Sequence, residues 1–231
     1  MTGKRFGLAG VIALTLILAV GTVWAFEADF DPSNYNPDVA EIVNFGTCES
    51  CLDGGGYRYT WDFDADGVPE VETEDALVTY AFSSAGYYEV VLTVTSASGR
   101  MSTRRKGILV GSLPAYGVRD VMPQSDGTML VLITINVTAE CSALGFTEDN
   151  PQGWQIEVID AGGSFAYPNP MTKRLEVVWG SQFSVGETVT FSYRLHPAYT
   201  STLRGLSGDL SGYTGEGRFI GRIGGELGGS E

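Results

Sequence analysis

The chain has 231 residues, of which 43% are hydrophobic and 18% charged, and its formal net charge is −14 at pH 7. This length fits one large β domain or two small ones, each able to bury a core. With 14 basic against 28 acidic residues, the chain lacks the clustered Lys and Arg that drive phosphate binding, which argues against nucleic acid as a partner.

The first 25 residues have the pattern of a secretory signal peptide. Lys4 and Arg5 precede an uncharged apolar stretch, residues 6–23, and the residues up to Ala25 fit a cleavage site. We therefore expect an exported chain, secreted or held at the cell surface. The alternative is a retained anchor, because the stretch approaches the roughly 20 residues that span a bilayer. A membrane is expected as a partner only through this segment.

Cys48 and Cys51 form a Cys-x-x-Cys pair. In an exported chain, the ordinary expectation is a local disulfide that braces a loop. Redox chemistry would need a helix N-terminus in a βαβ setting, and a zinc site would need two more ligands, for which only Cys141 and His196 remain. We predict a disulfide between Cys48 and Cys51, with Cys141 as an unpaired buried residue.

Two segments of the first half alternate in the manner of half-buried strands. From residue 57 to 64 the odd positions are aromatic and the even positions polar: Tyr57, Tyr59, Trp61 and Phe63 against Arg58, Thr60, Asp62 and Asp64. The second segment alternates Tyr88, Val90, Leu92 and Val94 with mainly polar residues, and residues 96–99 supply a turn.

Together, residues 57–67 and 85–94 resemble the core of a PKD domain. In that family, a tryptophan strand that ends in an Asp/Gly turn pairs with a later Gly-x-Tyr-x-Val-x-Leu-x-Val strand. The resemblance implies a small immunoglobulin-like β-sandwich over residues 27–111, an extracellular setting and no catalysis.

The turn after the tryptophan strand departs from the usual family pattern, Trp-Asp-Phe-Gly-Asp-Gly. Here residues 61–67 read Trp-Asp-Phe-Asp-Ala-Asp-Gly, which extends the turn and adds a carboxylate. Asp62, Asp64 and Asp66 followed by Gly67 match the first half of a calcium loop, in which oxygen ligands at alternate positions converge on the cation.

The second half of that calcium pattern is poorer. Its twelfth position is Thr73, where a bidentate Glu belongs, although Glu70, Glu72 and Glu74 are close enough to substitute. One interpretation is therefore a weak Ca²⁺ site formed by Asp62, Asp64, Asp66 and Glu70. In the other, Asp62 accepts hydrogen bonds from backbone amides of the turn, and Asp64 and Asp66 are solvated.

A domain boundary follows the first β-rich segment. Arg104-Arg105-Lys106, the only basic cluster, reads as a solvated strand edge, and a strand at residues 108–110 precedes several turn formers. We predict a linker at 112–117, a second domain at 118–226 and a flexible tail at 227–231. The glycine-rich stretch 221–231 is expected to fray.

The second domain is also rich in β patterns. Residues 129–137 and 188–195 alternate as strands, and shorter strands are expected near 153–158, 164–166 and 175–180, which suggests a seven-stranded sandwich. Residues 150–154, 162–165, 178–180 and 186–193 resemble an immunoglobulin-like repeat of prokaryotic secreted and surface proteins. That resemblance spans about 128–224 and implies a neighbour of PKD modules.

The sequence offers no catalytic constellation. His196 is the only histidine, and no Gly-x-Ser-x-Gly elbow is present to seat a nucleophilic serine. We predict an all-β protein, two tandem immunoglobulin-like sandwiches after an N-terminal signal helix, that is not an enzyme and holds no cofactor except Ca²⁺ at the acidic turn. The sequence does not define the oligomeric state.

Two functions fit this organisation. The first is a secreted or cell-surface PKD-domain protein that mediates protein or matrix contacts or acts as a spacer. The alternative is a carbohydrate-binding accessory module working with a secreted hydrolase, in which loop tyrosines stack on sugar rings: Tyr35, Tyr167, Tyr199 and Tyr213. Extracellular protein or polysaccharide is the expected partner.

Overall fold

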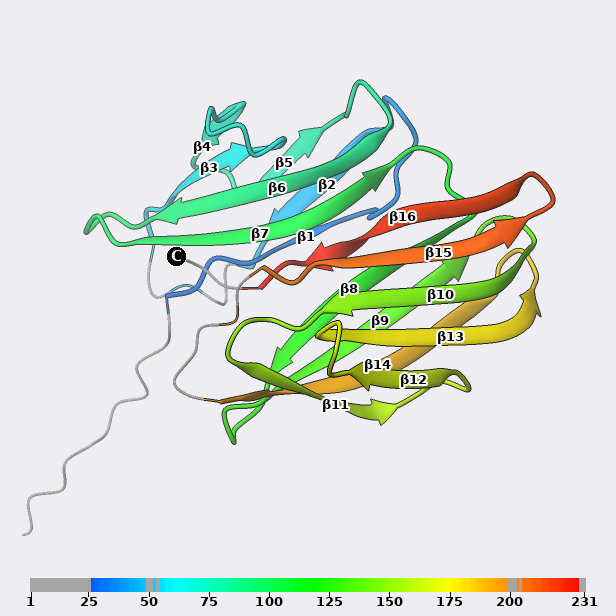
Figure 1. Cartoon of the computed structure of the whole chain (residues 1–231). Coiled ribbons are helices and arrows are strands. Elements are labelled where there is room, and N and C mark those ends of the chain that lie inside the picture. Colours follow the sequence, from blue (N-terminus) through cyan, green and yellow to red (C-terminus); the bar gives the residue numbers. More distant parts are fainter. Residues whose placement is uncertain (1–25, 49–51, 53–54, 199–202, 204, 229–231) are drawn as a thin grey trace, which may run out of the picture.

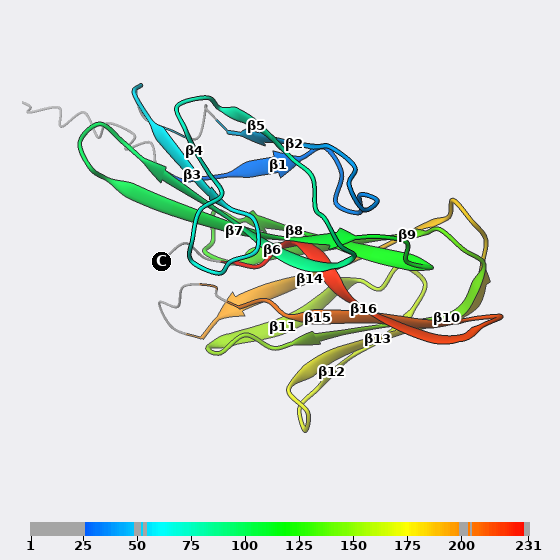
Figure 2. The same ribbon diagram turned by 90° about the horizontal axis from the view of Figure 1, so that it is seen from above.

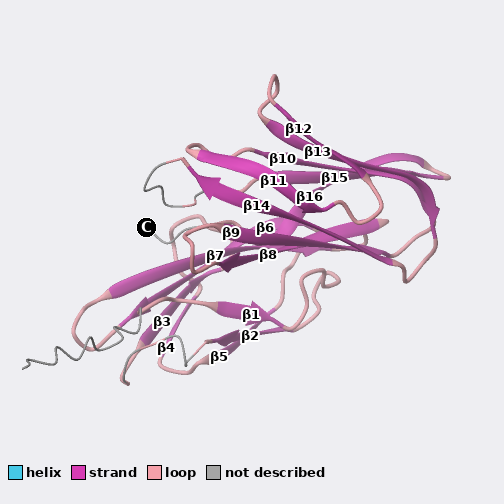
Figure 3. Ribbon diagram, turned by 90° about the horizontal axis from the view of Figure 1, so that it is seen from below, coloured by secondary structure: helices cyan, strands magenta, loops and turns pink. Residues whose placement is uncertain are grey.

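The computed structural model of the protein describes residues 26–48, 52, 55–198, 203 and 205–228. Within these residues every regular element is a β-strand (Figure 3), which confirms the predicted all-β class. The described part of the chain contains no helix long and apolar enough to cross a membrane. The predicted signal segment, residues 1–25, lies outside the described residues.

The first half of the chain forms two facing layers of strands (Figures 1 and 2). One layer is a three-stranded antiparallel sheet with the order β1 (Phe30–Pro32), β2 (Val43–Thr47) and β5 (Leu77–Tyr80). The other layer contains, in spatial order, β4 (Val71–Thr73), β3 (Arg58–Asp62), β6 (Gly86–Thr95) and β7 (Met101–Val110).

The core between these layers confirms the alternation predicted from the sequence. Tyr59, Trp61 and Phe63 are buried, and so are Val90, Leu92 and Val94 of β6, which pairs with β3. The Trp61 ring meets that of Phe30 edge-on, with centroids 5.1 Å apart, and thereby joins the two layers. The tryptophan strand is therefore the centre of the first sandwich.

The second half adds nine strands where the sequence suggested seven. One layer has the order β11 (Trp154–Asp160), β14 (Thr188–Pro197), β9 (Met129–Val137) and β8 (Ala115–Pro123). The other runs β12 (Phe165–Asn169), β13 (Arg174–Phe183), β10 (Cys141–Asp149), β15 (Gly208–Thr214) and β16 (Gly217–Glu226). The alternation of β10 is hidden because its register shifts near Ala143, which has a positive φ of 52°.

The end of β16 corrects the prediction that residues 221–231 fray, as far as residue 228; residues 229–231 lie outside the described residues. Residues 223–225 pair in parallel with β8, and Gly225 lies between Arg119 of β8 and Gly107 of β7. Beyond the strand, the Leu227 carbonyl still accepts a hydrogen bond from the Leu206 amide, at 2.9 Å. β16 thus passes between the two halves of the molecule (Figure 1) and joins their strands into one sheet.

Glycine at position 225 makes this crossing possible. Its φ is +80°, and a Cβ there would lie 2.2 Å from the Arg119 carbonyl oxygen. Any side chain would therefore be both strained and in collision with β8. In the sequence, the glycines near the C-terminus suggest a flexible tail. In the fold, Gly225 instead allows the backbone of β16 to lie directly against that of β8.

Two hydrophobic clusters lie on either side of the crossing. One draws its buried residues from 28–110 and the other from 115–223. Residues 115–117 of the predicted linker belong to β8, because they pair with β9, which leaves a connection of only a few residues between β7 and β8. The division of the chain into domains at 27–111 and 118–226 stays a prediction.

Candidate functional sites

The acidic turn, residues 62–70, connects β3 to β4. Asp62 ends β3, and its carboxylate accepts hydrogen bonds from the amides of Gly67, at 2.9 Å, and Asp64, at 3.3 Å. The Asp66 carboxylate accepts one from the Val68 amide, at 2.7 Å. The positive φ of Gly67, 88°, closes the turn. Asp62 thus accepts the hydrogen bonds from backbone amides that are expected if the turn is stabilised by Asp62 itself, without a cation.

Three carboxylates of the acidic turn also converge. Asp62, Asp64 and Glu70 each offer an oxygen within 4.8 Å of the others, and Asp62 is 9% exposed. Glu70 is held by a hydrogen bond from the Phe63 amide, at 2.7 Å. Carboxylate oxygens are the ligands that Ca²⁺ takes in proteins. The geometry therefore favours Asp62, Asp64 and Glu70 as a ligand set, and the predicted fourth member, Asp66, is not part of this group.

The carboxylates of the acidic turn lie beside the aromatic core. Tyr80 stacks on Phe63, with ring centroids 3.9 Å apart. Burial raises the pKa of the Tyr80 hydroxyl, and the negative charges of Glu70 and Asp64 raise it further. A cation at these carboxylates would sit against the edge of the first sandwich.

The cysteines fall into two environments. Cys48 is disulfide-bonded, and its predicted partner Cys51 lies outside the described residues, so the pairing itself stays a prediction. Cys141 is a free thiol and is buried, as the sequence indicated. Burial raises the pKa of the Cys141 thiol, and the charge of Glu187 adds to the shift. A raised pKa disfavours the thiolate and hence reactivity.

His196 and the tyrosines lie on open surfaces where the structure describes them. The imidazole Nε2 of His196 is 2.7 Å from a carboxylate oxygen of Glu157, and both side chains are exposed. Tyr167 and Tyr213 belong to strands β12 and β15 rather than to loops, and both are exposed. Tyr35 is half-buried, and Tyr199 lies outside the described residues.

The prediction that Arg104-Arg105-Lys106 is a solvated edge is wrong. β7 is an internal strand, bordered by β6 and by the end of β16, so Lys106 is only 3% exposed. Its Nζ lies 3.0 Å from a carboxylate oxygen of Glu226, whose other oxygen is 2.9 Å from Arg104 Nε. Arg105 points to the opposite face and pairs with Glu89 at 2.8 Å.

Asp29 and Asp31 complete this junction cluster, which we define as Arg104, Lys106, Glu226, Asp29 and Asp31. Both aspartates approach Lys106 Nζ, at 3.2 and 3.0 Å. Burial alone would lower the pKa of Lys106, but the surrounding negative charges, Glu226 first among them, outweigh it and raise that pKa. The junction cluster therefore keeps a charged ammonium inside the contact between the two halves.

Burial and the charge of Lys106 both act on the pKa values of Tyr35 and Glu226. Burial raises the pKa of the Tyr35 hydroxyl to about 12, although the Lys106 charge opposes the shift. Burial also raises the pKa of Glu226, against the attraction of Lys106 and Arg104. These groups lie together because β16 brings Glu226 to β7, a contact between distant parts of the chain.

A second buried pair connects the junction to the core of the second half. Arg119 and Glu148 have no exposed side-chain surface, and Arg119 Nη2 lies 2.5 Å from a Glu148 carboxylate oxygen. Arg119 Nη1 donates a hydrogen bond to the Glu226 carbonyl at 2.8 Å. Burial raises the pKa of Glu148, and Arg119 opposes this. Glu226 thus contacts cations of both halves, through its carboxylate on one side and its carbonyl on the other.

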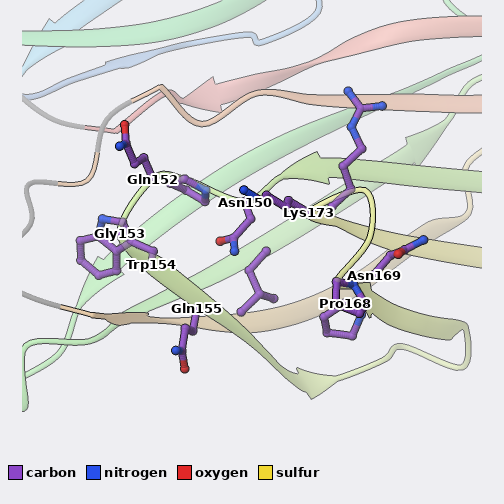
Figure 4. A pocket seen from close by; sticks show the side chains of 12 residues that line it. Asn150, Gln152, Gly153, Trp154, Gln155, Pro168, Asn169 and Lys173 are labelled. Atoms are coloured by element: carbon purple, nitrogen blue, oxygen red, sulfur yellow. The ribbon is translucent and has the colours of Figure 1, made fainter.

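A hollow of about 440 Å³ lies between the loop before β11 and the hairpin of β12 and β13 (Figure 4). Its apolar walls include Trp154, Ile156 and Pro168. Amide and cationic side chains surround it in Figure 4: Asn150, Gln152, Gln155, Asn169 and Lys173. The Asn150 Oδ1 is buried and accepts no hydrogen bond from the described residues. Apolar walls with a few polar groups are the usual lining of a ligand-binding hollow, and here the charged members, Lys173 and Arg174, are cationic.

Comparison with known families finds a PKD domain within the first half of the chain. Residues 39–106 match the model of the PKD domain, which confirms the resemblance seen in the tryptophan strand and its partner. Over 90 residues the chain is 34% identical to collagenase ColA of Clostridium perfringens (strain 13 / Type A). The aligned part is 38% of this chain and 8% of the collagenase, so the chain spans less than a tenth of that relative.

Solved structures similar to this fold are remote in sequence. The major pilin SpaD from Corynebacterium diphtheriae is 10% identical, with a TM-score of 0.41 over 72% of this chain and 57% of the pilin. A structure of carbohydrate-binding modules from the β-sandwich superfamily is 15% identical, with a TM-score of 0.34 over 86% of this chain and 97% of the other. These likenesses carry no argument about function. The second predicted immunoglobulin-like repeat stays a prediction.

Proposed function

We propose that this protein is a non-catalytic, secreted or cell-surface PKD-domain protein that contacts extracellular protein or polysaccharide and holds its two sandwiches as one spacer unit. The PKD match of residues 39–106 supports the extracellular setting and the binding role. The similarity to collagenase ColA covers too little of that protein to transfer its activity.

One observation carries the spacer role. The end of β16 lies between β7 and β8, and Glu226 binds Lys106 and Arg104 on one side and Arg119 on the other. Domains in one chain usually move relative to each other unless their interface is extensive. Here backbone hydrogen bonds and buried ion pairs replace a free linker, so the two sandwiches keep one orientation.

Electron spin resonance distance measurements test this orientation. Spin labels at Ser98→Cys in the first sandwich and Val185→Cys in the second occupy exposed positions. We expect one narrow distance distribution, which broadens when Glu226→Ala removes the carboxylate of the junction cluster. Glu157→Ala, an exposed carboxylate paired with His196, is the matched control and should leave the distribution narrow. A broad distribution in the otherwise unchanged protein would contradict the spacer role.

A carbohydrate-binding accessory role is the second candidate. It is favoured by the exposed side chains of Phe165, Tyr167 and Val178, which lie next to one another on one sheet face of the second half. Single exposed apolar residues need no explanation, but a contiguous set marks a binding surface.

A further inference from the structure

The outer face of the second half consists of the solvent side of β12, β13, β10, β15 and β16. Antiparallel pairing places directly opposed residues on the same side of a sheet, so the registers define rows across the five strands. One row is mostly apolar or small: Phe165, Val178, Gly145, Ser211 and Ile220. At about 4.8 Å per strand, this row is roughly 19 Å across.

The side chains at the two ends of this row are large and protrude, and those in the middle are small, so the surface is low at the centre of the row. Phe165 is 75% exposed and Ile220 61%, whereas Gly145 and Ser211 between them have small side chains or none. Val178, which is 51% exposed, lies next to Phe165 and extends the apolar rim. An extended ligand can therefore lie over the low centre and contact an apolar side chain at each end.

The neighbouring row is polar and carries two carboxylates and one guanidinium group. It contains Tyr167, Glu176, Thr147, Asp209 and Arg222. Arg222 lies 3.9 Å from Asp209, and Glu176 accepts hydrogen bonds from Asn169 and Thr172. The next row adds the ion pair of Arg174 with Asp149, and β16 adds Arg218. Three carboxylates and three guanidinium groups therefore make the face neutral on a protein whose net charge is −14.

Two hollows adjoin the face. A hollow of about 530 Å³ lies at the junction with the first sandwich and is lined on this side by Asp209, Ile220 and Arg222. Its other wall contains Tyr87 and Leu109 of the first sandwich and Leu113 of the connection between β7 and β8. Asn169 and Arg174, two rows away from the low row along β12 and β13, line the hollow of Figure 4. The low row itself therefore continues only into the junction hollow, at its Ile220 end.

We propose that this outer face binds an extended, uncharged polysaccharide. The proposal rests on the binding role given above and assigns it a ligand class and a surface. A sugar ring has an apolar face, which packs against Phe165, and hydroxyl groups at its edge, which reach the polar row. The net charge of the protein repels polyanions, and the equal numbers of carboxylates and guanidinium groups on the face leave no net negative charge there to attract a basic peptide.

Affinity electrophoresis of the full chain in gels that contain soluble polysaccharide tests the proposal. Soluble β-glucan, mannan and xylan are the neutral probes, polygalacturonate is the anionic probe, and polylysine in solution is the basic competitor. We expect retardation by at least one neutral probe and no retardation by polygalacturonate. Polylysine should not abolish the retardation at high ionic strength, which screens its attraction to the overall charge of −14. Phe165→Ala and Ile220→Ala should each weaken the interaction roughly tenfold, the loss that follows from one apolar contact.

The matched control is Val185→Ala, an exposed aliphatic residue outside the two rows, which should bind as the unchanged protein does. Three results would overturn the proposal: no retardation by any neutral probe, stronger retardation by polygalacturonate or displacement by polylysine at high ionic strength, or unchanged binding by Phe165→Ala and Ile220→Ala. The spin-label distances are independent of these results. A narrow distance distribution without glycan binding would refute the ligand class and leave the spacer role intact.

Discussion

The acidic turn and the junction cluster use carboxylates in opposite ways. In the acidic turn, Asp62 and Asp66 accept hydrogen bonds from amides within five residues of themselves. In the junction cluster, Glu226 reaches Lys106 and Arg104 from the far end of the chain. The first arrangement organises a loop at the surface, and the second holds two sandwiches together. Asp62 and Glu226 are both buried, so the distance along the chain to their partners distinguishes the two roles.

The difference in burial between charged groups determines how much stability the protein should lose when each group is changed. Buried charges are costly when a partner is removed, whereas exposed carboxylates lose little because water replaces their partners. Four substitutions or titrations test the contrast, beginning with the most deeply buried pair.

Replacing Arg119 by Ala should cause the largest loss. The change leaves Glu148 buried without its cation and removes the hydrogen bond to the Glu226 carbonyl. Breaking a buried pair costs about 3–5 kcal/mol of unfolding free energy. Urea denaturation followed by tryptophan fluorescence measures it. Arg174→Ala removes an equally short but exposed pair with Asp149 and should leave the midpoint nearly unchanged. Equal losses of unfolding free energy in Arg119→Ala and Arg174→Ala would contradict the expected difference between buried and exposed ion pairs.

Gly225→Ala should be the next most damaging change. The added Cβ would meet the Arg119 carbonyl oxygen, and the backbone there has a φ of +80°. Strain of this kind costs about 2–3 kcal/mol. Thermal unfolding compares it with Gly221→Ala in the same strand, where no heavy atom lies within 4 Å of the added Cβ. If both variants melt like the unchanged protein, the crossing of β16 is not as tight as described.

Alkaline pH should weaken the junction through Tyr35. Its pKa is raised to about 12 in the folded state from 10.0, so the folded state retains the proton more strongly. The resulting stability is complete below pH 10 and is lost as the pH rises from 10 to 12. We expect about 1–2 kcal/mol for a partly buried tyrosine. Tyr35→Phe should flatten the decline in denaturation midpoints over this interval, and the exposed Tyr213→Phe should not. A decline unaffected by Tyr35→Phe would show that other groups control it.

Calcium at the acidic turn should give the smallest effect. A millimolar site gains about 1 kcal/mol of stability at a few millimolar Ca²⁺, because the ligand binds only the folded state. Asp64→Asn should abolish the rise in melting temperature, and Asp66→Asn should preserve it, since Asp66 lies outside the convergent group. If the calcium-dependent rise were lost in Asp66→Asn but kept in Asp64→Asn, Asp66 would be a ligand, as the sequence pattern predicts, and the convergent group of Asp62, Asp64 and Glu70 would not be the site. If Ca²⁺ does not raise the melting temperature of the unchanged protein, the acidic turn does not bind calcium and its carboxylates only stabilise the loop.

The sequence predicts those parts of the fold that depend on local patterns. Alternation around Trp61 defines a buried strand, because side chains of a strand point to its two faces in turn. The same rule finds β9 and β14. It misses β10, where the register shift at Ala143 interrupts the alternation, and it undercounts the strands of the second half.

Contacts between distant residues are not accessible to this reasoning. Nothing near Lys106 in the chain indicates that Glu226 will cover it, so a basic cluster reads as solvated. Likewise, glycines 224 and 225 read as a flexible tail, although they permit the close approach of three strands. At the candidate calcium site, the sequence identifies the carboxylates, and only the turn geometry separates Asp66 from Asp62, Asp64 and Glu70.

Differential scanning calorimetry of the unchanged protein and of Glu226→Gln tests most directly whether β16 and the junction cluster make one unit of the two sandwiches. We expect a single transition for the unchanged protein, with equal calorimetric and van't Hoff enthalpies, because the halves unfold together. Glu226→Gln should lower the melting temperature and separate the transition into two. Two transitions in the unchanged protein would contradict the account, because the sandwiches would then unfold independently.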